Sequence, residues 1–256
     1  YQISSWAEKT SYEAAAAIIA VSDGMRADVL AAYPSVDPKK VVTIRNGVDT
    51  SKFAPNNNPA VLQEFGITGR YAMFVGRITR QKGLAHLLRA WKSVPAEYGL
   101  VLAAGSPDEE TVGNEVAALI AELQATRSNV WWIKEMLPHD KLTAALTQAD
   151  LFLCPSIYEP LGIVNLEAMG CETAVLASRV GGIPEVVSHQ ETGILVDYTA
   201  DHVRFEADLT AAISELMADP ARLEKYGKAG RLRAQTHFGW DAVAAQTISL
   251  YRSVIS

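Results

Sequence analysis

One segment of the sequence concentrates the residue types needed to bind a charged, hydroxyl-rich ligand. In PSIYEPLGIVNLEAMG, residues 155–170, a strand should end in a proline-containing loop and a helix should begin near Gly162. Glu159 lies in that loop, and Glu167 lies on the helix eight residues later. If the helix begins there, both carboxylates can face the mouth of a sheet. One carboxylate can accept hydrogen bonds from vicinal ribose hydroxyls, at about 1.5–3 kcal/mol each, and the other can bind sugar hydroxyls.

The backbone of the same turn adds uncharged hydrogen-bond donors. The N–H groups of Leu161, Gly162, Ile163 and Val164 should point toward the same space, because the first N–H groups of a helix have no partner within it. Gly162 removes a side chain where backbone and ligand must approach closely. The alternative for Glu167 is an ordinary surface position. The LEAM stretch around it is largely apolar, however, so a glutamate there needs a partner.

A second segment supplies positive charge. GRITRQKG, residues 76–83, places Arg77 and Lys82 in a strand-to-helix loop. Ligands bind at this edge of doubly wound sheets, where helix N-termini favour anions. A fork of arginine donors and a mobile lysine charge suit two phosphates of different orientation. The residue order matches neither a Walker A loop nor the G-x-G-x-x-G fingerprint. Taken alone, the loop could simply be solvated.

A third segment, SRVGGIPEVV at residues 178–187, contains Gly181 and Gly182 before Pro184 at an early helical position. The glycines allow a tight turn after a strand. The turn either only closes that strand or also contacts a phosphate or sugar through its backbone.

Composition limits the classes of partner. The 256 residues carry a formal net charge of -6, which argues against binding nucleic acid through its phosphates. No apolar run approaches the roughly 18 residues of a membrane span. Cys154 and Cys171 sit among apolar neighbours and are expected to be buried, reduced thiols, which predicts a cytoplasmic protein. The histidines lack metal-ligand spacing, so no metal site is expected.

The elements that position these loops alternate between strand and helix, which indicates parallel α/β architecture. From Tyr71 onward, six strands with crossover helices predict a doubly wound parallel sheet of the Rossmann type. The expected strands are YAMFVG, GLVLAAG, VWWI, DLFLCPS, TAVLAS and TGILVDY.

The two ends of the chain differ from this pattern. We expect residues 1–55 to be a remnant of a preceding α/β domain, because two short strands and two helices cannot close a sheet alone. Ser22 should cap its second helix. Residues 56–70 read as a linker, 71–236 as a nucleotide-sugar-binding domain, and 237–256 as a helix packing back on the first domain.

The three motifs together resemble the retaining GT-B glycosyltransferases of the large group-1 family, in which the six-stranded unit is the C-terminal, donor-binding domain. SSWAEKT, AIIAVSDGM and VTIRNGVDT also resemble the region between the two domains of that family, so the resemblance covers nearly the whole chain. Within the family, SIYEPLGIVNLEAM and SSWAEKT look most like the actinobacterial glycogen synthases of the maltose-1-phosphate synthase type, which use ADP-glucose.

The resemblance implies roles for matching residues. Arg77 and Lys82 would neutralise the diphosphate leaving group, Glu159 would contact the transferred sugar, and Glu167 would bind the ribose. Backbone amides would add to phosphate and sugar binding at Gly162, Ile163 and Val164.

Two further positions follow from the same resemblance. The backbone near Glu135 and Met136 would face the base, and Asn46 would lie at the floor of the cleft. The KTGG motif of classical bacterial glycogen and starch synthases is missing, but it would belong to the absent first domain. Glu167 itself is a departure from those synthases, which lack the second glutamate.

The expected reaction transfers glucose from ADP-glucose to an α-glucan or sugar-phosphate acceptor with retained configuration, without metal or cofactor. A mannosyl- or glucosyltransferase using GDP-mannose or UDP-glucose is the alternative. A nicotinamide-dependent oxidoreductase or an epimerase lacks its glycine fingerprint here. Because roughly 130–150 residues of a normal first domain are expected to be missing, a noncatalytic nucleotide-sugar-binding module is a further alternative, and we expect donor binding without turnover.

Overall fold

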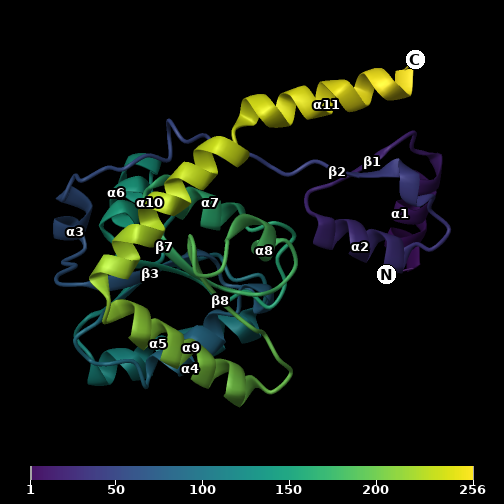
Figure 1. Cartoon of the computed structure of the whole chain (residues 1–256). Coiled ribbons are helices and arrows are strands. Elements are labelled where there is room, and N and C mark those ends of the chain that lie inside the picture. The colour runs from purple at the N-terminus through teal and green to yellow at the C-terminus, as the bar shows by residue number, and fades with distance from the viewer. Residues whose placement is uncertain (1, 256) are drawn as a thin grey trace.

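The computed structural model describes residues 2–255 and divides their strands between two parallel sheets (Figure 1). The larger sheet has six strands in the order β5-β4-β3-β6-β7-β8. Every neighbouring pair within it is parallel. Its strands are β3 (Tyr71–Arg77), β4 (Gly99–Gly105), β5 (Val130–Ile133), β6 (Leu151–Cys154), β7 (Ala174–Ser178) and β8 (Gly193–Val196). The prediction of a doubly wound parallel sheet is confirmed, and all six strands fall where the sequence predicts them.

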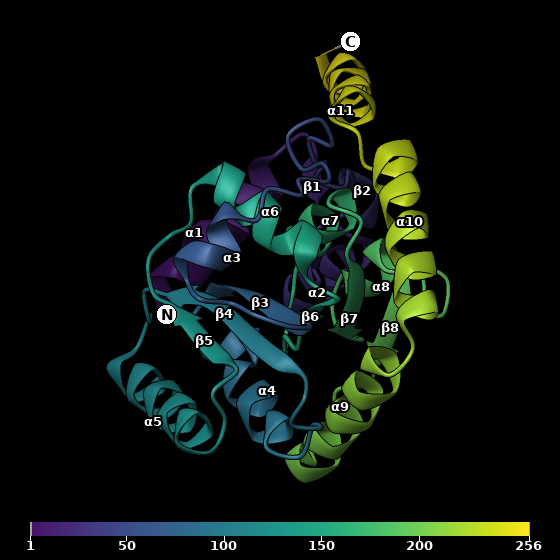
Figure 2. The ribbon, with the colours of Figure 1, turned by 90° about the vertical axis from the view of Figure 1, so that its left-hand side faces the viewer.

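Helices cover both faces of this sheet (Figure 2). One face carries α4 (Leu84–Trp91), α5 (Glu110–Thr126) and α9 (His202–Met217). The other carries α3 (Ala60–Glu64), α6 (His139–Gln148), α7 (Ile163–Gly170) and the short α8 (Ile183–Val186). The helix α10 (Pro220–His237) packs on α7 and β7.

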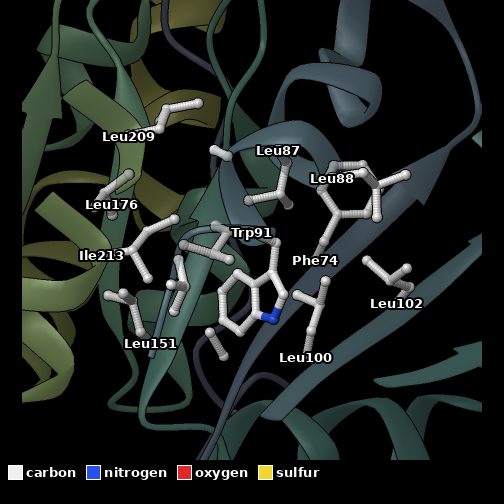
Figure 3. Close-up of a cluster of buried hydrophobic side chains, with 14 of the residues drawn as sticks. Phe74, Leu87, Leu88, Trp91, Leu100, Leu102, Leu151, Leu176, Leu209 and Ile213 are labelled. Atoms are coloured by element: carbon white, nitrogen blue, oxygen red, sulfur yellow. The ribbon is translucent and has the colours of Figure 1, made fainter. Parts of the chain in front are cut away.

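The sheet separates two apolar cores because successive side chains of a strand point to opposite faces. In β3, Ala72 and Phe74 belong to the first core, whereas Tyr71 and Met73 belong to the second. Trp91 of α4, fully buried, lies at the centre of the first core (Figure 3). Burial on both faces explains why the strands read as nearly continuous apolar runs.

Residues 2–43 form a separate small unit with α1 (Gln2–Ala14), β1 (Ile18–Ala20), α2 (Asp23–Ala32) and β2 (Val41–Thr43). Its two strands pair in parallel and have their own small core around Val29. Ser22 caps α2 by accepting a hydrogen bond from the amide of Met25, as predicted.

The expected linker is more ordered than its Asn- and Pro-rich start indicates. It contains α3, and Val61 and Ile67 are buried in the second core. The first half of this segment is rich in Asn and Pro, whereas the second half contains apolar residues that pack into the core. The assignment of residues 56–70 and of the other domain boundaries stays a prediction.

The last helix, α11 (Trp240–Ile255), extends beyond the six-stranded unit in both views (Figures 1 and 2). None of its described residues is buried. Just before it, the carbonyl of Phe238 accepts a hydrogen bond from the amide of Val48 at 2.8 Å. The predicted packing of this helix on the first domain stays a prediction. Within residues 2–255, no helix is long and apolar enough to cross a membrane.

Candidate functional site

The candidate site lies where the order of the large sheet reverses. β3 starts the sheet in sequence, β4 and β5 lie to one side of it, and β6, β7 and β8 lie to the other. The loops after β3 and β6 therefore leave adjacent strands in opposite directions. Ligands of doubly wound sheets bind at this point, beyond the carboxyl ends of the strands.

The structure brings Lys82 and Glu159 together at this point. Lys82 follows β3, Glu159 follows β6, and the Lys82 Nζ lies 2.6 Å from the Glu159 Oε2. Glu159 is only 8% exposed, so its carboxylate needs this partner. Two residues that the sequence places 77 positions apart thus form one ion pair.

A glycine allows the two loops to meet. Gly83 has a φ of +64°, and a Cβ built on it would lie 1.9 Å from the carbonyl oxygen of Pro155. The amide of Ile157 donates to the carbonyl of Gln81 at 2.8 Å, which joins the loops further. The backbone, and not only the ion pair, therefore fixes Lys82 beside Glu159.

The glycine turn after β7 supports Glu159 from another side. The amide of Gly182 donates to the carbonyl of Glu159 at 2.9 Å. A Cβ on Gly181 would lie 2.0 Å from that carbonyl oxygen, so a larger residue would displace the loop. This turn does more than end a strand, because it holds the backbone that carries Glu159.

The first unit also contacts this loop. The hydroxyl of Ser22 donates to the carbonyl of Pro160 at 2.6 Å. Arg45, which follows β2, pairs with Glu185 of α8 at 2.6 Å. Both contacts join residues that are more than a hundred positions apart, and they attach the small sheet next to the site.

The helix α7 begins where the sequence predicts it. Gly162 is its N-cap, with a φ of +92° that favours glycine. Among the described residues, the amides of Gly162, Ile163 and Val164 donate no hydrogen bond, so they are free to bind an anion or a hydroxyl. The side chain of Leu161 is buried in the second core, so only its backbone faces the loop.

Glu167 lies one turn further along α7 and is half-buried. Burial raises the pKa of Glu167 from 4.5 to about 7, and the charge of Lys82 acts against that rise. Carboxyl groups with a pKa raised toward neutral by burial, and with a nearby charge partner, are common at functional sites. Lys82 therefore contacts Glu159 directly and acts on Glu167 through its charge, whereas the predicted roles of the two carboxylates stay predictions.

Arg77 is separated from this group. Its side chain is 67% exposed and pairs with Asp108 at 2.8 Å. The register explains the pair, because Arg77 lies opposite Gly105 of β4 and Asp108 follows three residues later. The predicted joint action of Arg77 and Lys82 therefore requires Arg77 to leave Asp108.

A cavity of about 200 Å³ lies beside the ends of β3, β4 and β5. Glu135 and Met136 line it, together with Gly76 and Arg77. Met136 is 95% exposed, so its side chain is free to cover a ligand. Asn46 is half-buried in the connection after β2, and it is not among the described residues that line this cavity.

Two polar residues of the site were not found from the sequence. Ser156, which is buried, donates to the Glu159 Oε2 at 3.2 Å. Asn165, on the buried side of α7, lies against Gly162. The only sequence signal was the presence of polar residues within the otherwise apolar runs LFLCPS and IVNLEAM.

Both cysteines are free and buried, as predicted. Burial raises the pKa of the Cys154 thiol and raises that of Cys171 to about 12, so neither is an activated nucleophile. Within the described part of the chain, no group of three or more His, Cys, Asp or Glu residues could hold a metal ion.

Comparison with known proteins identifies the family. A family profile described as "Glycosyl transferases group 1" matches residues 63–233, and one described as "Glycosyltransferase Family 4" matches residues 1–52. The chain is 50% identical to an alpha-maltose-1-phosphate synthase of Mycolicibacterium smegmatis, over 99% of the chain and 67% of that protein.

Solved structures share the fold. The sucrose-phosphate synthase of Thermosynechococcus elongatus is 30% identical, with a TM-score of 0.84 over 100% of this chain and 62% of that one. HepE of Anabaena, solved in complex with UDP-glucose, has a TM-score of 0.87 at 20% identity, over 98% of this chain and 68% of that one. With its profile match over more than half its length, the chain belongs to the group 1 glycosyltransferases and has their GT-B type of fold.

Proposed function

We propose that this chain binds a nucleoside diphosphate sugar, with ADP-glucose as the preferred donor. In the intact enzyme, the glucosyl group would pass with retained configuration to an α-glucan or sugar-phosphate acceptor. The observation that carries the proposal is the meeting of Lys82, Glu159, Glu167 and the free amides of α7 at the switch point of the sheet. The M. smegmatis relative is an alpha-maltose-1-phosphate synthase, which supports the choice of sugar and acceptor.

The charges of the site match those of the reaction. Departure of the diphosphate builds up negative charge, which Lys82 and the amides of Gly162, Ile163 and Val164 are placed to stabilise. Arg77 can leave Asp108 and join them at a small free-energy cost. An exposed ion pair such as that with Asp108 contributes at most about 1 kcal/mol. We expect these cations and amides to suffice without a metal ion.

The two carboxylates have different tasks in this proposal. Glu159, released from Lys82, accepts hydrogen bonds from hydroxyls of the transferred sugar. Glu167, in its ionised form, accepts hydrogen bonds from the ribose hydroxyls. The acceptor attacks the anomeric carbon from the face of the leaving group, the bond to the phosphate oxygen breaks, and that oxygen takes the acceptor's proton.

The chain spans about two thirds of the M. smegmatis relative. Acceptor-binding residues supplied by the remaining third would be needed for turnover. For the chain itself we therefore propose donor binding without transfer.

Calorimetric titration with ADP-glucose, UDP-glucose and GDP-mannose tests the proposal. Lys82→Met should weaken donor binding about ten- to hundredfold, since a hydrogen bond to a charged group contributes about 1.5–3 kcal/mol. Lys92→Met, which removes an exposed ion pair with Glu122, is the matched control and should leave affinity unchanged. Preference for GDP-mannose would move the function to mannosyl transfer. Failure to bind any of the three donors would overturn the proposal.

A further inference from the structure

Asn165 is a buried polar residue whose amide lacks a strong hydrogen-bond partner. Its side chain is fully buried, and neither Nδ2 nor Oδ1 has a hydrogen-bond partner among the described residues. Its polar neighbour is the thiol of Cys154, a weak donor and acceptor. Buried amides are nearly always satisfied, because leaving a donor or acceptor without a partner costs free energy.

The Asn165 amide lies beside Gly162, in the turn that joins Glu159 to α7. It belongs to the first turn of α7, and its Nδ2 lies 2.6 Å from the position that a Cβ would take on Gly162. The Cγ of Glu159 lies 3.5 Å from that same position. The Asn165 amide and the side chain of Glu159 therefore both pack around Gly162, which makes them neighbours.

While Lys82 contacts Glu159, the carboxylate does not need this amide. Its Oε2 already receives Lys82 at 2.6 Å and Ser156 at 3.2 Å. The situation changes when a donor binds, because Lys82 is the cation placed to bind the diphosphate. A carboxylate that is only 8% exposed would then keep one long hydrogen bond from Ser156. Burying a charge with so few partners is costly.

We propose that Asn165 is a positioning residue for Glu159, an inference that rests on the proposed function. Its amide donates to the Glu159 carboxylate when Lys82 turns from that carboxylate to the donor's diphosphate. The hydrogen bond holds Glu159 against the transferred sugar and replaces part of the lost charge interaction. Leaving the Asn165 amide without a strong partner while Lys82 contacts Glu159 is the free-energy cost of keeping this replacement partner in place.

A double-mutant cycle tests the proposal without any donor. Lys82→Met removes the cation permanently and so imitates its departure. In the wild-type background, Asn165→Leu should leave the Tm unchanged or raise it, because it removes two unpaired polar atoms from a buried position. In the Lys82→Met background, the same substitution should lower the Tm by about 2–4 °C, the shift expected for a lost hydrogen bond in a chain of this size.

Leu166→Val, a change at the neighbouring fully buried position, is the matched control. It should lower the Tm equally in both backgrounds, because Leu166 packs in the second core and faces no charge. A merely structural residue would not make Asn165→Leu destabilising only in the background that lacks Lys82. Equal effects of Asn165→Leu in both backgrounds would overturn the proposal.

Donor titration then separates this inference from the proposed function. Asn165→Leu should weaken ADP-glucose binding about tenfold, whereas Leu166→Val should leave the affinity unchanged. If the wild-type chain binds ADP-glucose and Asn165→Leu binds it equally well, Asn165 has no positioning role but the proposed function stands. If the wild-type chain binds no donor, the proposed function fails, and the sign of the stability cycle still decides whether Asn165 supports Glu159.

Discussion

Glu167→Gln should make the folded chain more stable at pH 8 while weakening donor binding. Burial is the main cause that raises the pKa of Glu167 from 4.5 to about 7. Each pKa unit corresponds to about 1.4 kcal/mol, so ionising this carboxyl in the folded protein costs roughly 3 kcal/mol. Glutamine has nearly the same size and no charge, and it avoids that cost.

The pH dependence follows from the direction of the shift. The folded state binds the Glu167 proton more tightly than the unfolded state does. This contribution to stability is fully present below about pH 4.5 and is lost as pH rises through about 7. The stability difference between Glu167→Gln and wild type should therefore grow with pH, to roughly 3 kcal/mol at pH 8, or about 6–12 °C in Tm.

Urea denaturation at several values between pH 5 and pH 8 measures this difference. Glu122→Gln, which removes an exposed carboxylate of α5 paired with Lys92, is the control and should change stability by less than about 1 kcal/mol. Wild-type affinity for ADP-glucose should rise from pH 6 to pH 8, whereas that of Glu167→Gln should be weaker and flat. A stability difference that is the same at pH 5 and pH 8 would refute the reasoning.

Three further substitutions test the packing that positions the site. Gly83→Ala should destabilise the chain by on the order of 3 kcal/mol in urea denaturation, because its Cβ would lie 1.9 Å from a carbonyl oxygen. Gly66→Ala is the control: its φ is +63° and the space around it is open, so it should cost only about 1 kcal/mol. Trp91→Ala should cost about 3–5 kcal/mol by the same measurement, since it empties the centre of the first core. Arg45→Ala should speed cleavage of the connection after β2 in limited proteolysis, because it removes the ion pairs joining the first unit to α8; an unchanged cleavage rate would show that these pairs do not hold the units together.

The large sheet was predictable because its strands are buried on both faces. Apolar runs such as LFLC and AVLAS, separated by helices of the right length, leave few other arrangements. The start of α7 was also predictable, because a glycine after a proline-containing loop precedes a largely apolar run. The connection was harder to predict, since α3 has only five residues and its burial depends on packing against α6.

The sequence could not predict which charged residues of the site meet. It indicated Lys82, Glu159 and Glu167 as functional residues, which stays a prediction, and it grouped Lys82 with Arg77. The structure pairs Arg77 with Asp108, because β3 lies next to β4 in register. Strand order in a sheet is a long-range property, so local spacing could not decide which charges meet.

The sequence by itself determined the elements, the motifs that end them and the family to which they belong, since these depend on local periodicity, turn chemistry and residue type. Only the tertiary structure decided that Lys82 contacts Glu159, that Gly181 and Gly182 support the backbone of Glu159, and that the buried amide of Asn165 lies beside Gly162 without a geometric hydrogen bond. These facts depend on which loops leave neighbouring strands and on how closely their backbones pack. Burial and contact across 77 residues of chain are set by the whole fold, and no local pattern encodes them.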